Sequence, residues 1–452
     1  MACSVGEASV HPKTAHVRMR RRKAPGAIGR RMARPAFAVE RGRTPWYVQM
    51  PMPQLLHVDP ASFLVDSFRL GKKVYLSRFR PRHAISLWRG GTPVGLGVDA
   101  FFRSRGLRIN HTTIATDSYT GIAQQTEVHV KNLEHLIEVV CPEDGLLIID
   151  DVYESGNTIR RVVEYLRQKA RANAPREIVV AAVHHKPEKA KYNELPVIAL
   201  ERIDEHVWID YPHELADLVS PDDPDDKLLK EKDPEIWRIL RGGPSEPMEI
   251  HVEGDYYYVQ PRELLLDSIR LGVNIAHDES YRPDFLVALW PGGVVAGLPV
   301  HEVYKYFQLK AGGKYKTPDH VSVNAFPTRQ SYRNRIIGLD YLQDHINYRD
   351  NVLIIDTTFR AGKLVNDVVA RLKEVLRRNL THDRVRVASV YYNPDDRSTW
   401  TVRPDIRQPH YWLKMIRKEV INPHGIHNLP DPHRDLQGLN PQLWKVLYGE
   451  DE

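Results

Sequence analysis

The stretch "LLIIDDVYESGNTIRRVV", residues 146–163, decides how the chain is expected to fold. It opens with an unbroken apolar run, as a strand buried on both faces does, and the run ends at two adjacent carboxylates, Asp150 and Asp151. A short polar turn around Gly156 follows, and the apolar spacing after it predicts an amphipathic helix opened by Thr158. Further strand-length runs such as "AISLW" and "EIVVAAV" alternate with helix-like stretches. This alternation predicts an α/β fold in which helices flank a mainly parallel sheet.

The same unit recurs about two hundred residues later. "IIDTTFRAGKL", residues 354–364, repeats the apolar approach, the first acid and the glycine. "LVDSFRLG" at 64–71 returns as "LLDSIRLG" at 265–272, and "DPEIWRILRGG" at 233–243 returns as "NPQLWKVLYGE" at 440–450. Because the order is kept throughout, we predict a tandem duplication with domains at 44–243 and 244–452.

Length, cysteine content and charge limit the class of protein. No apolar run in the 452 residues approaches the roughly 20 needed to cross a bilayer. Cys3 and Cys141 match neither a metal spacing nor a disulfide framework, so we expect a cytoplasmic protein with no membrane partner. The whole chain carries +6, and residues 1–43 alone hold a surplus of nine positive charges, which leaves −3 for the remainder. This distribution argues against nucleic-acid binding by the folded part.

The basic tail at residues 1–43 has few large apolar residues, and we expect it to be disordered. It could be a nucleic-acid-binding arm, an organelle-targeting segment or the product of a start codon placed too far upstream, since Met19 and Met32 offer later starts.

The polar turn after the acid pair has the composition of a phosphate cradle. Backbone N–H groups of such a turn and of the following helix attract an anion, and Gly156 lets the backbone approach it. Carboxylates beside an anion site would be repelled by the phosphate itself, so Asp150 and Asp151 should hold sugar hydroxyls or a magnesium ion. The expected ligand is therefore a ribose 5-phosphate.

The stretch resembles the phosphoribosyl pyrophosphate motif of type I phosphoribosyltransferases. The resemblance implies two tandem domains of that fold, each with a small hood, and a Mg2+ ion bound mainly through phosphoribosyl pyrophosphate. It assigns the ribose hydroxyls to the acid pair and the 5-phosphate to Ser155, Gly156, Asn157 and Thr158. Tyr153 and Glu154 depart from the commonest pattern, which has a small aliphatic residue and Asp.

Two other loops match the same family. The turn in "LWRGG" resembles the pyrophosphate loop, which implies that Arg89, Gly90 and Gly91 bind the leaving group. "ATDSYTG" resembles the mobile loop of the hypoxanthine-guanine branch, in which the pair corresponding to Ser118 and Tyr119 closes over the reacting centre. The second half also holds a Ser-Tyr pair, at residues 331–332.

The resemblance also implies a purine-binding site. Lys186 ends a strand where the purine enzymes place a lysine that donates to the exocyclic 6-oxygen; the alternative is a strand end in solvent. "HVWIDYPHE" resembles the hood, with Trp208 stacking on the base and Ile209 backbone groups reading its edge. Trp208 could instead be a core residue. Glu214 is a second metal ligand or a helix-start acid.

These parts predict transfer of a phosphoribosyl group from phosphoribosyl pyrophosphate to a purine base, with a 6-oxopurine preferred over adenine, release of pyrophosphate and Glu154 assisting proton transfer. The alternatives are transfer to an unusual base in nucleoside natural-product assembly and a non-catalytic regulator that senses a nucleotide or phosphoribosyl pyrophosphate. In the second half, most chemical positions change: Asp151 to Thr357, Glu154 to Arg360, Arg89 to Pro291 and Lys186 to Asn393, while Asp356, Gly362 and an aromatic residue at Trp412 survive. We therefore predict an inactive second copy that acts as a structural partner in an intramolecular pseudo-dimer, regulates the first site or has a different chemistry.

Overall fold

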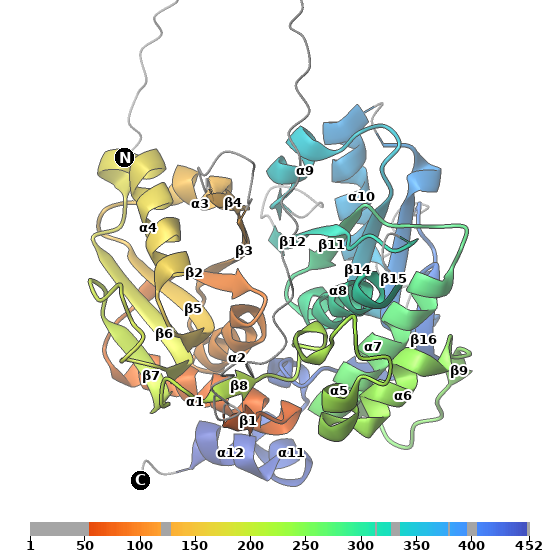
Figure 1. Ribbon diagram of the computed structural model, residues 1–452, viewed down its shortest axis with the longest axis horizontal. Helices are drawn as coiled ribbons and strands as arrows, with labels where there is room; N and C mark the ends of the chain where they lie inside the picture. The colour runs from red at the N-terminus through yellow and green to blue at the C-terminus, as the bar shows by residue number, and fades with distance from the viewer. Residues whose placement is uncertain are drawn as a thin grey trace, which may run out of the picture. The chain divides into compact units, whose positions relative to one another are not determined.

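The structure is a computed structural model that describes residues 54–118, 128–311, 314–326, 335–377, 380–395 and 405–449. Residues 53–452 form one compact unit (Figure 1). The basic tail at 1–43 lies outside the described residues. No helix in the described part of the chain is long and apolar enough to span a bilayer.

The first half is built on a six-stranded sheet with the strand order β4-β3-β2-β5-β6-β7. All neighbouring strands run parallel except β4, which is antiparallel to β3. The strands are β2 (Pro81–Trp88), β3 (Asn110–Ser118), β4 (Val128–Lys131), β5 (Gly145–Tyr153), β6 (Glu177–His185) and β7 (Val197–Arg202). The predicted α/β class with a mainly parallel sheet is confirmed.

Helices cover both faces of this sheet because the central strand is apolar on both. The β5 residues Leu146 to Ile149 are fully buried, and alternate ones contribute to two different cores. One core lies under α1 (Pro60–Leu76) and α2 (Gly91–Ser104), and the other lies under α3 (Glu134–Val139) and α4 (Asn157–Ala170), which runs into the short helix η1 (Arg171–Asn173). Continuous burial of β5 therefore fixes the layered fold.

A separate two-stranded parallel sheet stands where a hood was predicted. β1 (Leu55–His57) pairs with β8 (Trp208–Asp210), with Leu55 opposite Trp208. The chain continues into η2 (Ala216–Leu218), α5 (Lys227–Lys232) and α6 (Pro234–Gly242).

The sheet of the second half has the same order of strands with one more strand, β9, at its edge. This order is β13-β12-β11-β14-β15-β16-β9, and only the β12–β13 pair is antiparallel. The strands are β9 (Met248–Glu249), β11 (Phe285–Leu289), β12 (Asp319–Phe326), β13 (Arg335–Ile337), β14 (Val352–Phe359), β15 (Val385–Tyr392) and β16 (Tyr411–Met415). β10 (Tyr256–Tyr258) and β17 (Glu419–Ile421) form the second small sheet.

The helices of the second half also follow the order of the first. They are α7 (Pro261–His277), α8 (Gly292–Ala311), α9 (Asp340–His345), α10 (Lys363–Leu376), η5 (His382–Arg384), η6 (Ile426–Asn428), α11 (Pro432–Leu439) and α12 (Pro441–Tyr448). The matching orders agree with the predicted duplication, which stays a prediction together with its boundaries.

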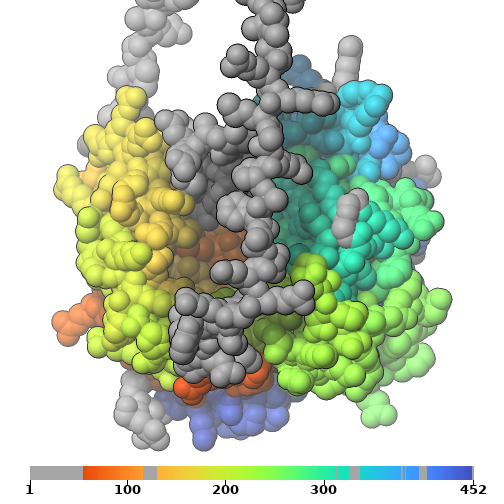
Figure 2. Space-filling view, viewed as in Figure 1, coloured from red at the N-terminus to blue at the C-terminus, as the bar shows by residue number. Residues whose placement is uncertain are grey.

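The last helices of each half pack on the opposite half. Leu229, Ile236 and Leu240 of α5 and α6 join the core under α7, and Leu436 and Leu443 of α11 and α12 join the core under α1. Figure 2 shows the blue surface of the C-terminal residues next to the orange surface of the first described residues. Each sheet's core is therefore completed by segments from both halves.

Candidate active site

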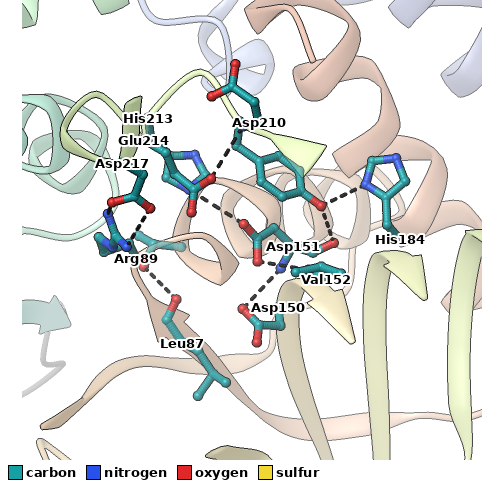
Figure 3. Close-up of polar contacts among 12 residues, drawn as sticks. Leu87, Arg89, Asp150, Asp151, Val152, His184, Asp210, His213, Glu214 and Asp217 are labelled. Atoms are coloured by element: carbon teal, nitrogen blue, oxygen red, sulfur yellow. Dashed lines mark hydrogen bonds and ion pairs between the residues drawn. The ribbon is translucent and has the colours of Figure 1, made fainter. Parts of the chain in front are cut away.

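The predicted acid pair lies at the carboxyl end of β5, at the sheet edge where ligands of parallel sheets gather (Figure 3). Asp151 is buried, and its Oδ1 accepts a hydrogen bond of 2.8 Å from the Val152 N–H. Burial and the charge of Asp151 raise the pKa of Asp150 well above its ordinary value. Burial would also raise the pKa of Asp151, but the His213 imidazole beside it outweighs this and lowers it. The pair therefore favours one ionised and one protonated carboxyl.

The turn after the acids has the backbone that the sequence predicts. Gly156 has φ 73°, in the left-handed region, and a Cβ there would lie 2.5 Å from Tyr153 Oη. The helix begins at Asn157, one residue before the predicted opening at Thr158, because the left-handed glycine already directs the chain into it. Tyr153 is buried, and its hydroxyl donates to the Tyr192 carbonyl. Tyr153, which replaces the usual aliphatic residue, thus packs against the turn at Gly156 and stabilises it.

The double-glycine turn packs directly against the end of β5. A Cβ at Gly90 would overlap the Asp151 carboxylate, and one at Gly91 would overlap the Ile149 carbonyl oxygen. Only glycines permit this approach, which brings the backbone of the Arg89 turn into contact with the acid pair.

Arg89 is held by two carboxylates that the sequence did not indicate. Its Nη1 lies 3.0 Å from Glu302 Oε1, and its Nη2 lies 3.3 Å from Asp217 Oδ2. Burial would lower the pKa of Arg89, but the charges of Glu302 and Asp217 outweigh it and raise the pKa further. The guanidinium is therefore a fixed cation at the edge of the site.

The base-site candidates divide between a buried ion pair and an exposed ring. Lys186 is buried, and its Nζ donates to Glu154 Oε1 at 2.9 Å, as does Lys189 Nζ. Burial would raise the pKa of Glu154, but the bonds from Lys189 and Lys186 lower it. Trp208 is 50 % exposed, which excludes a core role, and the next residue, Ile209, is buried and pairs with Leu56.

The predicted mobile loop falls mostly outside the described residues. Ser118 ends β3, but its side chain and all of Tyr119 lie in the part that the structure does not describe. The Ser-Tyr pair at 331–332 lies outside it as well.

His213 is a site residue that the sequence reasoning missed. Its Nε2 lies 3.6 Å from Asp151 Oδ2, and its ring stacks on Tyr211 with centroids 5.6 Å apart. Oxygen and nitrogen atoms of Asp151, His213 and Glu214 lie within 4.8 Å of one another, which suits a divalent cation. Burial raises the pKa of Glu214 to about 7. A signal was available, because "PH" at 212–213 recurs at Pro423–His424 in the second half.

The second half keeps the backbone of the site and changes its side chains. Asp356 is partly buried, and its removal from water raises its pKa to about 7, while the Thr357 hydroxyl donates to the Gly292 carbonyl. Arg360 pairs with Glu419 where Glu154 pairs with lysines in the first half.

The suggested equivalence of Trp412 and Trp208 is wrong. Trp412 lies on β16 opposite Ser389, whereas Glu419 pairs with Tyr256 as Trp208 pairs with Leu55. The aromatic position of the first hood therefore holds a glutamate in the second.

No family model and no curated protein matches the chain. Among solved structures, a hypothetical protein from Neisseria gonorrhoeae with bound ppGpp matches at 19 % identity and a TM-score of 0.31, over 40 % of this chain and 96 % of that one. A purine phosphoribosyltransferase from Pyrococcus horikoshii matches at 18 % and 0.26, over 35 % and 92 %. The xanthine-guanine-hypoxanthine phosphoribosyltransferase of Helicobacter pylori matches at 23 % and 0.28, over 35 % and 92 %.

Proposed function

We propose that the first half transfers the 5-phosphoribosyl group of phosphoribosyl pyrophosphate to a 6-oxopurine base and releases pyrophosphate. One observation carries the proposal: Asp150 and Asp151 end a buried strand between two glycine-dependent turns, the turn of Gly90 and Gly91 and the turn of Gly156. A ligand that carries a diol flanked by two phosphate groups has the matching chemistry.

In the proposed reaction, the bond between the anomeric carbon and the pyrophosphate oxygen breaks, and a bond to a purine nitrogen forms. Asp150 and Asp151 orient the ribose through its hydroxyls, and the amides at the start of α4 bind the 5-phosphate. Arg89 faces the charge that develops on the leaving group. Closure of the Ser118–Tyr119 loop would exclude water from the cationic centre.

Asp151, His213 and Glu214 fit a divalent cation by donor type and spacing. A magnesium ion would supply charge stabilisation to the pyrophosphate, and it would be held mainly by the substrate, with Glu214 and Asp151 as carboxylate ligands.

Lys186 is the basis for the preference for an oxo group on the purine. Its ammonium can only donate, so it favours an exocyclic oxygen over an amino group. The ion pair with Glu154 holds it in place and keeps Glu154 ionised. Glu154 can then accept the proton that the purine ring loses, although its lowered pKa makes it a weak base.

For the second half we propose a structural role as the partner in a pseudo-dimer. The reciprocal packing of α5 and α6 on α7, and of α11 and α12 on α1, supports it. A regulatory nucleotide site around Arg360 is the alternative. Replacing Arg360 by Glu should leave turnover nearly intact if the role is structural, whereas an altered response to added nucleotides would indicate regulation.

Pyrophosphate release tests the proposal. The full chain is given magnesium and phosphoribosyl pyrophosphate with hypoxanthine, guanine, xanthine or adenine, beside the Asp150→Asn/Asp151→Asn variant. Turnover with an oxopurine that disappears in the variant supports the assignment. Tight donor binding without turnover on any base contradicts it and favours an unusual acceptor or a regulatory role.

A further inference from the structure

Glu302 is a buried carboxylate of the second half that reaches the Arg89 turn of the first. It lies on α8, is fully buried, and accepts hydrogen bonds from Arg89 Nη1 at 3.0 Å, Lys305 Nζ at 3.0 Å and the Ala216 N–H at 3.3 Å. Burial would raise the pKa of Glu302, but Arg89 and Lys305 outweigh it and lower it. An ionised carboxylate that is buried among three donors has little freedom to move.

The second carboxylate on Arg89 has a different character. The side chain of Asp217 is 29 % exposed, and its contacts with the guanidinium are longer, at 3.3 and 3.4 Å. A pair of this kind exchanges partners at little cost, because water can solvate the released carboxylate. Arg89 is thus bonded to one immobile and one replaceable acceptor.

The reciprocal position in the other half lacks both members of the pair. Ala100 lies nine residues after Gly91, as Glu302 lies nine residues after Gly293. At the two equivalent positions a methyl group and a proline replace the carboxylate and the arginine, and the acid that lines the cavity beside Pro291, Asp99, pairs with Arg103 of its own helix α2. The ion pair of this position with the other half is thus found on the side that has the arginine, which connects Glu302 with Arg89.

We propose that Glu302 is a positioning residue supplied by the second half, which anchors Arg89 while Asp217 gives up its place to the pyrophosphate group. This inference rests on the proposed function for the identity of the anion. The several N–H donors of the guanidinium allow this exchange of partners. Glu302 stays bonded to Nη1, and the remaining donors can bond to a second acceptor. The second half would then be required by the chemistry of the first site as well as by its fold.

The test compares three variants of the full chain. Glu302→Gln keeps the size of the side chain and one acceptor but removes its charge. Asp217→Asn weakens only the exposed partner of Arg89, which the pyrophosphate is proposed to replace. Asp319→Asn is the matched control, because Asp319 forms another ion pair between the halves, with buried Lys131 rather than with Arg89. Binding of magnesium pyrophosphate is measured by calorimetry, KM and kcat by turnover, and exposure of Arg89 by its rate of modification with phenylglyoxal, read by peptide mass spectrometry.

We expect Glu302→Gln to weaken pyrophosphate binding and raise KM for the donor about tenfold, as loss of a charged hydrogen bond does, with a smaller change in kcat. Arg89 should be modified faster in this variant, Asp217→Asn should bind pyrophosphate as tightly as the parent chain or tighter, and Asp319→Asn should match the parent in all measurements. Equal changes in Glu302→Gln and Asp319→Asn would overturn the inference, as would equal weakening in Glu302→Gln and Asp217→Asn. If no base is turned over, the proposed function fails alone, because pyrophosphate affinity and Arg89 modification still decide the role of Glu302.

Discussion

The turns that follow β5 and β14 start from the same backbone and carry different charges. Gly156 and Gly362 both adopt left-handed φ angles, 73° and 65°, above an aromatic ring. Gly91 and Gly293 both press on a strand carbonyl that a Cβ would overlap. The difference lies in the side chains that would face a ligand. Packing against the end of the strand therefore keeps the backbone the same even where these side chains differ.

The pairing of the charged residues differs between the two turns in a systematic way. In the first half Glu154 binds lysines from the loop after β6, whereas in the second half Arg360 binds Glu419 of the small sheet. The residue on the turn is thus an acid in the first half and a base in the second, and its partner lies on a different element. That partner, Glu419, holds in the second half the position that corresponds to Trp208. Predictions that separate the two halves therefore test the functional assignment directly.

The largest effect is expected from removing the second half. A chain that ends after Gly243 leaves Leu229, Ile236 and Leu240 without the core under α7. Each buried side chain contributes about 1.5–3 kcal/mol, and their loss is a large part of a typical domain stability of about 5–15 kcal/mol. We expect insoluble protein that is rescued by co-expression of residues 244–452. A full chain with Lys363→Ala, an exposed change in the second turn, should stay soluble, and a soluble, active first half alone would contradict the pseudo-dimer.

The acid pair provides the next contrast. Asp151→Asn should lower kcat/KM for phosphoribosyl pyrophosphate by about 10²–10³, since a charged group that orients the ribose is lost in a buried site. Asp356→Asn, the matched change in the second half, should alter kcat/KM less than twofold. Steady-state kinetics with the best base measures both, and similar losses in the two variants would show that the second site takes part in the reaction.

The hood gives a smaller contrast. Trp208→Ala should raise KM for the base roughly tenfold, because stacking of a base on an aromatic ring contributes about 1–3 kcal/mol, while Trp208→Phe should recover part of it. Trp412→Ala is the control, since Trp412 lies on β16 and away from the position equivalent to Trp208. Unchanged KM in Trp208→Ala would remove this residue from the base site.

The smallest effect concerns pH and the acid retained in the second half. Burial raises the pKa of Asp356 to about 7, above its value of about 3.9 in an unfolded chain. The folded state therefore holds more protons between these values, and stability falls as pH rises from about 4 to 7 and then levels off. Asp356→Asn removes this loss, so its melting temperature should exceed that of the parent by about 2–4 °C above pH 7 and by little near pH 4. A constant difference across this range would show that ionisation of Asp356 is not the cause.

Much of the fold and part of the site could be read from the sequence because they depend on local rules. The buried run before Asp150 predicts a central strand, and the glycine after it predicts a left-handed turn into a helix, which begins within one residue of the expected position. Lys186 and Glu154 were both named as site residues, but their ion pair was not foreseen. His213 was missed because a histidine after a proline has no spacing relation to an acid pair on another strand.

The sequence by itself determined the alternation of strands and helices and predicted two copies of the unit with the residues that differ between them, because periodicity and glycine positions act over a few neighbouring residues. Only the tertiary structure decided which helices complete which core and which groups meet Arg89. Its anchor Glu302 is 213 residues away along the chain. Contacts of this kind form when two halves close on each other, and side-chain geometry at the closed interface, rather than any local pattern, selects them.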